Sequence, residues 1–114
     1  MGHLRAPSLL PALAVAALAA LAQPSHAACY EDFGCTDSDR FAARTLRKAS
    51  CDVLWDIRNG IYKENGYCFR TARAISEFGN AGCAYDDAAD VPLNAIERQN
   101  IAAVQSVENA KGCE

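Results

Sequence analysis

Apolar residues downstream of residue 27 recur at helical spacing, and the clearest case lies in the middle of the chain. Leu54, Ile57 and Ile61 follow one another at intervals of three and four residues, so they share one face of a helix. Val53 and Trp55 widen that face. The pattern predicts an amphipathic helix that buries this stripe against the rest of the domain.

Residues that bond to free backbone groups mark both ends of this helix. Ser50 can accept a hydrogen bond from the first turn, and Asp52 places a negative charge at the positive end of the helix dipole. Asn65 and Gly66 end the helix, because glycine adopts the left-handed conformation that closes a helix without steric cost. We therefore expect a helix over residues 50–65, with Gly66 in that conformation.

A second long helix is predicted near the C-terminus. Asn94 and Glu97 form a capping box, in which each side chain bonds to the backbone amide of the other residue. Lys111 followed by Gly112 is typical of a helix end. The residues expected to face inward are Ile96, Ile101, Val104 and Val107.

Two shorter helices complete the prediction. Side-chain oxygens at residues 36–39 favour a helix start and predict a first helix over residues 37–48. Thr71 caps a brief helix that runs through Phe78, and the acidic stretch 83–92 is expected to be a loop. The predicted fold class is mainly α: one small, disulfide-stapled helical domain of three to four helices over residues 28–114.

Residues 1–27 are built like a secretory signal peptide. A start that carries Arg5 precedes an apolar run over residues 9–22, and small residues around Ala27 form a cleavage site. At about 1.5 Å per residue the run spans about 21 Å, less than the ~30 Å hydrocarbon core of a bilayer, so no permanent membrane anchor is expected. Cleavage after Ala27 is the first expectation and after Ala28 the second, which gives a periplasmic or secreted product.

Cysteine, histidine and charge narrow the chemistry of the exported part. All six cysteines follow residue 27, and an even number in a short exported chain indicates disulfides. His3 and His26 precede residue 28, so the exported part lacks the commonest general base and transition-metal ligand. Loss of Arg5, the one charged residue before position 28, lowers the formal net charge from −3 to about −4. This acidic balance argues against nucleic acid as a partner.

Six cysteines allow 15 pairings, and the sequence alone does not select one rigorously. If the two long helices pack antiparallel, Cys51 at the start of the helix over residues 50–65 meets Cys113 after the C-terminal helix. The next pair then brackets the short helix after Thr71, and the last pair closes the N-terminal loop. The expected disulfides are Cys51–Cys113, Cys68–Cys83 and Cys29–Cys35.

A specific pattern of residues lies between positions 54 and 69. Its members are Arg58, Asn59, Ile61, Tyr62, Gly66, Tyr67 and Phe69. The pattern resembles the YARHG domain, a small bacterial extracytoplasmic module named after a Tyr-Ala-Arg-His-Gly signature. Lys63, Glu64 and Asn65 replace the signature's Ala, Arg and His, so no role of that histidine carries over.

A second stretch, residues 93–101, is similar to the family's closing Leu-Asn-x-Ile-Glu-x-x-Asn-Ile helix. Together the two blocks span about residues 46–107. The resemblance implies an extracytoplasmic module, and it brings no established reaction or ligand. The cysteine set falls outside the general signature and indicates a disulfide-bearing variant.

Four residues of the first block form the predicted contact surface. Arg58 and Asn59 are expected either to form an exposed recognition pair or to fix neighbouring backbone and a carboxylate. Tyr62 and Tyr67 would either stack on a sugar or peptide or pack as closing contacts beside the helix end. Because an arginine and tyrosines supply much contact area at low ordering cost, we take all four as the candidate binding residues.

No catalytic residue, metal site or cofactor is predicted. Asp52 and Glu64 would lie about 18 Å apart on one helix, which is too far for a glycosidase pair. Asp86, Asp87 and Asp90 lack the alternating spacing and central glycine of a calcium loop, so a solvated loop is expected there. The cysteines show no Cys-x-x-Cys spacing that would favour metal.

Three classes of function stay open. The leading one is a noncatalytic module that binds an envelope protein or a cell-wall component. The second is an inhibitor of a hydrolase, which would need one rigid exposed loop, and residues 79–92 are the candidate. The third is a hydrolase that acts through carboxylates alone, which would need a cleft that a domain of this size can scarcely build.

Overall fold

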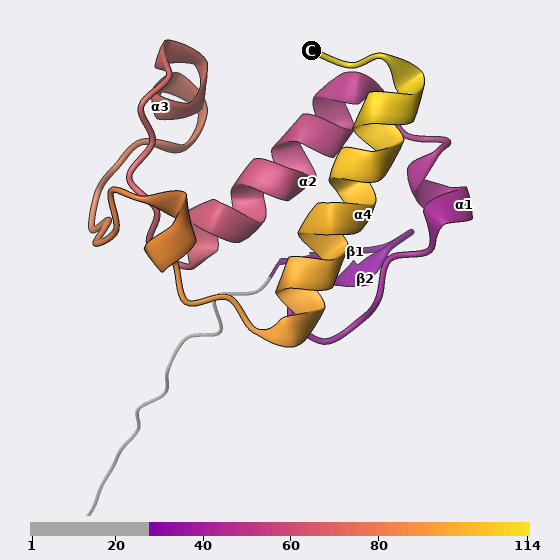
Figure 1. Cartoon of the computed structure of the whole chain (residues 1–114), viewed down its shortest axis with the longest axis horizontal. Coiled ribbons are helices and arrows are strands. Elements are labelled where there is room, and N and C mark those ends of the chain that lie inside the picture. The colour runs from indigo at the N-terminus through magenta and orange to yellow at the C-terminus, as the bar shows by residue number, and fades with distance from the viewer. Residues whose placement is uncertain (1–27) are drawn as a thin grey trace, which may run out of the picture.

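Two antiparallel helices, α2 (Cys51–Glu64) and α4 (Ala95–Lys111), form the centre of the fold (Figure 1). The computed structural model describes residues 28–114. The predicted signal peptide, residues 1–27, lies outside the described residues. Within residues 28–114, none of the helices has the length and hydropathy needed to span a bilayer.

Short elements lie on both sides of this helix pair. A two-stranded antiparallel hairpin pairs Cys29 with Cys35, and α1 packs on α4. In Figure 1, α3 stands on the other side of α2, away from α4. These elements are β1 (Cys29–Tyr30), β2 (Gly34–Cys35), α1 (Ala43–Leu46), α3 (Ala72–Phe78) and the 3-10 helix η1 (Ala88–Asp90). The mainly α prediction is confirmed, and η1 is one turn inside the stretch predicted as loop.

The predicted caps fix the helix ends. The Ser50 hydroxyl accepts a hydrogen bond from the amide of Val53 at 3.2 Å, and Thr71 caps α3 in the same way. Asn94 and Glu97 form both halves of the capping box at the start of α4. Each cap satisfies amides that a helix start otherwise leaves without partners.

The core lies between α2 and α4 and extends to α1. Leu54, Ile57 and Ile61 are at most 1% exposed, which confirms the predicted stripe. Val53 does not widen it, because it is 42% exposed: neighbouring helix positions point about 100° apart, and its side is left uncovered. The buried cluster consists of Phe41, Leu46, Leu54, Ile57, Ile61, Ile101, Val104 and Val107.

On α4, the prediction that Ile96 faces inward is only partly correct. Ile96 is half-buried, and two polar side chains of this turn and the next are buried instead: Glu97 is 5% exposed and Asn100 is 1% exposed. Both are satisfied by hydrogen bonds, which is the condition for burying polar groups at tolerable cost.

The predicted first helix over residues 37–48 is wrong in its first half, and Asn100 is the reason. Its side-chain oxygen accepts from the amide of Phe41 at 2.9 Å, and its amide donates to the carbonyls of Thr36 and Asp39 at 3.0 and 2.8 Å. Asp39 itself accepts from the amide of Cys35 at 2.8 Å. These bonds replace the helical ones, so α1 begins only at Ala43.

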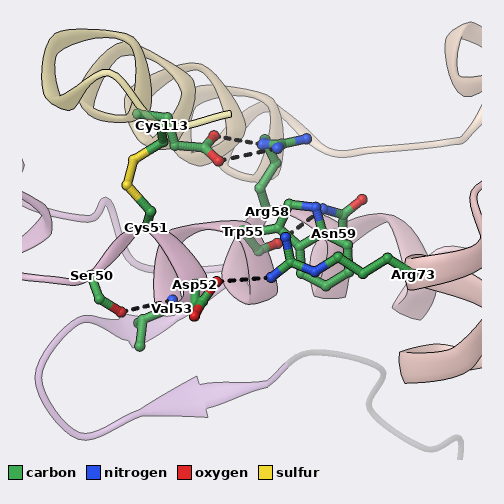
Figure 2. Close-up of polar contacts among 10 residues, drawn as sticks. Ser50, Cys51, Asp52, Val53, Trp55, Arg58, Asn59, Arg73 and Cys113 are labelled. Carbon is green, nitrogen blue, oxygen red and sulfur yellow. Dashed lines mark hydrogen bonds and ion pairs between the residues drawn. A yellow bond between two sulfur atoms is a disulfide. The ribbon is translucent and has the colours of Figure 1, made fainter.

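The three disulfides join Cys51 to Cys113, Cys68 to Cys83 and Cys29 to Cys35, the pairs that the helix arrangement predicted. All six cysteines of the chain are used. Cys51 and Cys113 close one end of the α2–α4 pair (Figure 2). Three disulfides fit an oxidising compartment.

The disulfides differ in the loops that they close, and we expect their removal to follow that order. The loops contain 62, 15 and 6 residues for Cys51–Cys113, Cys68–Cys83 and Cys29–Cys35. Chain-entropy losses of about 4, 3 and 2 kcal/mol follow for the corresponding double alanine variants. Urea unfolding measures them, and a larger loss for the hairpin pair than for Cys51–Cys113 would contradict the account.

Two glycines of α2 and its closing turn should respond oppositely to alanine. Gly66 has φ 93°, and an added Cβ would lie 3.2 Å from the Tyr85 ring, so Gly66→Ala should cost about 1–2 kcal/mol. Gly60 is helical, and its Cβ would meet only the Tyr30 hydroxyl at 3.7 Å. Gly60→Ala should therefore stabilise by between zero and about 1 kcal/mol. Equal midpoints in thermal unfolding would contradict both assignments.

Candidate functional site

The turn that follows α2 is the centre of the candidate site. Asn65 ends the helix, Gly66 reverses the chain, and the amide of Tyr67 donates to the carbonyl of Tyr62 at 3.1 Å. The turn thus brings the Tyr62 and Tyr67 rings to 5.6 Å between centroids. The two tyrosines act as closing contacts beside the helix end, and both keep part of their surface exposed.

A second segment lies against this turn and forms the other wall of the site. The carbonyl of Gly66 accepts from the amides of Ala84 and Tyr85 at 2.7 and 3.0 Å, and the amide of Cys68 donates to the carbonyl of Tyr85 at 2.8 Å. The Cys68–Cys83 disulfide crosslinks the same two segments of the chain. Backbone and covalent bonds together hold the two walls at a fixed spacing.

The loop after α3 is anchored at further points. The Asn80 side chain accepts from the amide of Phe69 at 2.7 Å and donates to its carbonyl at 2.9 Å. The Lys63 ammonium donates to the carbonyl of Gly79 at 3.3 Å. Because two side chains hold this loop through three hydrogen bonds, it forms a fixed wall of the site.

A cleft of about 470 Å³ opens between the two walls. Aromatic rings, a cation and a carboxylate line it together, which is the mixed chemistry that ligand pockets use to fix orientation. The lining residues are Lys63, Glu64, Asn65, Gly66, Tyr67, Ala81, Gly82, Cys83, Tyr85 and Pro92.

Glu64 is the titratable group of this cleft with an altered acidity. Burial raises the pKa of its carboxyl to about 7, and the neighbouring Glu97 and Asp37 carboxylates act in the same direction. Hydrogen bonds from the backbone of Ala28 and from the Thr36 hydroxyl oppose the shift. In the sequence Glu64 stood out as a replacement in the YARHG signature and as a possible partner of Asp52, and only the fold shows that it is half-buried among acidic groups.

Glu97 is not available as a second reactive carboxylate beside Glu64. One of its oxygens accepts from the amide of Asn94 at 2.9 Å, and the other accepts from the side chain of Asn65 at 2.8 Å. Asn65 also donates to the carbonyl of Ile61 at 2.7 Å. Asn65, which stands where the YARHG signature has histidine, therefore joins the turn to the start of α4.

Arg58 is tied to α4 and lies away from this cleft. Its guanidinium makes a two-point ion pair with Glu108, with N–O distances of 2.6 and 3.1 Å (Figure 2). The two side chains are 23% and 9% exposed. Such a fork-to-carboxylate pair fixes geometry as well as charge.

Asn59 and the polar groups near it are also bonded to other groups of the protein. The Asn59 amide donates to the carbonyl of Trp55 at 3.0 Å (Figure 2). Arg73 of α3 lies 3.8 Å from the centre of the Trp55 ring and pairs with Asp52 at 3.0 Å. The Trp55 ring and Arg73 thus link α3 to α2 on the side away from α4.

The four candidate binding residues do not line one cavity. Tyr67 lines the cleft, and Tyr62 borders a separate depression of about 330 Å³ beside η1. Arg58 borders a third depression with Glu108, and Asn59 bonds within its own helix. In the part of the chain that the structure describes, no group of three potential ligands is placed to hold a metal ion.

Several residues on which the site depends carry no clear signal in the sequence. Tyr85 faces the turn through one isolated backbone bridge with Tyr67, and no periodic pattern reports such a contact. Glu108 sits among polar residues near the end of α4, so its burial against Arg58 is visible only once α2 and α4 are paired.

We predict different costs for neutralising the two carboxylates that pair with arginine. Glu108→Gln removes a charge from a nearly buried bidentate pair and should lower the free energy of unfolding by about 1.5–3 kcal/mol. Asp52→Asn, the matched control, acts at an 87% exposed side chain and should cost less than about 1 kcal/mol. Chemical unfolding of both variants decides it, and equal costs would show that the Arg58–Glu108 pair does not hold α2 to α4.

Comparison with known families agrees with the pattern of the two motif blocks. The model of the YARHG domain matches residues 32–109, which is more than half of the chain. No curated protein and no solved structure gives a significant match. The turn after α2, the pairing of α2 with α4 and this family match agree with one another: the chain belongs to the YARHG domain family.

Proposed function

We propose that the domain is a noncatalytic exported module that holds an envelope protein or a cell-wall component in the cleft beside the Tyr62–Tyr67 turn. The observation that carries the proposal is the cleft itself, which has two crosslinked walls and a mixed lining of tyrosine, lysine and glutamate. Membership of a family of small extracytoplasmic domains supports it.

The rigidity of the walls favours binding. A ligand that enters a preformed site does not have to order loops, and that ordering usually subtracts from affinity. Tyr67 and Tyr85 offer flat apolar area with a polar hydroxyl, and Lys63 adds a positive charge to the lining. These groups suit a peptide or sugar chain with both apolar and polar faces.

The four predicted binding residues divide into two roles in this proposal. Tyr67 contacts the ligand, and the Tyr62 ring packs against the Tyr67 ring with 5.6 Å between the ring centroids. Arg58 and Asn59 position the helix, because their polar groups already bond to Glu108 and Trp55. Binding should therefore depend directly on Tyr67 and only indirectly on Arg58.

The hydrolase alternative has weak support in the arrangement of carboxylates. Glu64 has the raised pKa of a general acid, but both oxygens of its neighbour Glu97 are occupied by hydrogen bonds. A glycosidase needs a second free carboxylate to act as base or nucleophile. The cleft thus supplies one half of such a mechanism.

The inhibitor alternative rests on the exposed tip of the loop after α3. Ala81 and Gly82 are exposed, while Asn80 and Cys83 on either side are fastened to Phe69 and Cys68. A rigid exposed loop of this kind could enter the active site of a hydrolase. The identity of the captured partner distinguishes this function from the leading one.

Site-specific photo-crosslinking in the native cell tests the binding site. We expect a benzophenone side chain at Ala81, which lines the cleft and is exposed, to capture a partner or a cell-wall fragment. The same group at Ala110, exposed near the opposite end of α4, is the matched control and should capture nothing comparable. Ala81→Arg, which fills the cleft without removing a contact, should weaken capture at least tenfold.

Two outcomes would contradict the proposal. Equal capture from positions 81 and 110 would move the contact surface away from the cleft. Hydrolysis of cell wall or peptide by the pure protein, abolished by Glu64→Gln, would replace the noncatalytic function with an enzymatic one.

A further inference from the structure

The first residue that the structure describes, Ala28, is held in place from three sides. Its carbonyl accepts from the amide of Thr36 at 2.9 Å, and the next residue, Cys29, is crosslinked to Cys35. Thr36 joins it to Glu64 at the end of α2, because the Thr36 hydroxyl donates to Glu64 Oε2 at 3.3 Å, and the backbone of Ala28 lies near enough to the Glu64 carboxyl to act on its pKa. The hairpin thus carries the Ala28 nitrogen to a fixed position beside a half-buried carboxylate.

Glu64 lies in an acidic environment without a cationic partner among residues 28–114. Its Oε2 accepts from the hydroxyl of Thr36 at 3.3 Å, and Thr36 is 1% exposed. The ion pairs of the described residues involve other side chains, and Lys63 next to it donates to the carbonyl of Gly79. The acidic groups that face this place are Tyr30, Asp37, Asp56 and Glu97.

We infer that Glu64 is the receptor for the α-ammonium group of the processed chain: cleavage after Ala27 turns the Ala28 amide into a cation beside the Glu64 carboxylate, and the ion pair fastens the new N-terminus to α2. The peptide bond between Ala27 and Ala28 is hydrolysed with one water, and the released amine takes up a proton. Cleavage after Ala28 would remove the group that bonds to Glu64. The geometry therefore favours the first of the two expected cleavage positions.

The chemistry explains why an acid stands at this place. With an amide at Ala28, the carboxylate is desolvated near other acids, and its pKa is raised to about 7. An ammonium group offers a full positive charge in the same position, which favours the ionised carboxyl and lowers its pKa. Export and folding become coupled, because removal of the leader adds an interaction that the precursor lacks. The inference depends on cleavage and not on whether the cleft has a ligand.

The acidity of the Ala28 amine is the direct test. The full-length chain is expressed with its leader, the exported protein is purified, and its intact mass gives the first residue. Reductive methylation with ¹³C-formaldehyde keeps the positive charge and makes the terminal amine visible by NMR. We expect its pKa to lie at least one unit above the usual ~7.7–8.0 of an α-amine. Glu64→Gln should return it to that range, whereas Glu31→Gln, at an exposed residue of the same hairpin, should leave it raised.

The pH dependence of stability provides a second readout. In protein acetylated at the α-amine, Glu64 binds its proton more tightly in the folded than in the unfolded state, so the melting temperature should fall as pH rises from about 4.5 to about 7. With the free amine this fall should be absent, because the ionised carboxyl is then favoured in the folded state. Tyr30, Asp37, Asp56 and Glu97 are present in both forms, so the difference between the two profiles reports the α-ammonium group.

Either of two results would overturn the inference. One is a mature chain that begins at a residue other than Ala28. The other is an α-amine pKa that the Glu64→Gln substitution leaves unchanged, together with identical pH profiles for free and acetylated chains.

Discussion

The antiparallel pairing of α2 with α4 is the constraint on which the rest of the structure depends. Three links of different chemistry hold it along its length: the Cys51–Cys113 disulfide at one end, the Arg58–Glu108 ion pair between the ends, and the Asn65–Glu97 hydrogen bond at the other end. Apolar side chains fill the space between them. A small domain buries too little surface to rely on its core alone, so these links supply both stability and register.

The same pairing explains why the two motif blocks occur together. Arg58 and Asn65 come from the first block, and Glu97 and Asn100 come from the second. Asn100 bonds to the segment before α1, and Glu97 bonds to the turn after α2. The motif residues therefore fix the backbone around the cleft, and that frame carries the cleft-lining residues Tyr67, Lys63 and Glu64.

The sequence predicted correctly those features that depend on residues close together in the chain. Ser50 and the Asn94–Glu97 box identified two helix starts. The expected antiparallel packing of the two long helices identified the disulfide pairs. The first half of the predicted first helix was wrong because Asn100, distant in sequence, bonds to its backbone groups. The cleft was not predictable either, since it forms where residues 63–67 meet residues 81–85, and periodicity carries no information on such contacts.

Native-state hydrogen exchange tests the central claim, that α2 and α4 form one cooperative unit to which α3 is attached. The amides of Ile61 and Val104 lie in the buried parts of the two helices. We expect them to exchange only through global unfolding, with the same opening free energy, while α3 opens at a lower free energy. Opening of α4 at a lower free energy than α2, with the disulfides intact, would contradict the account.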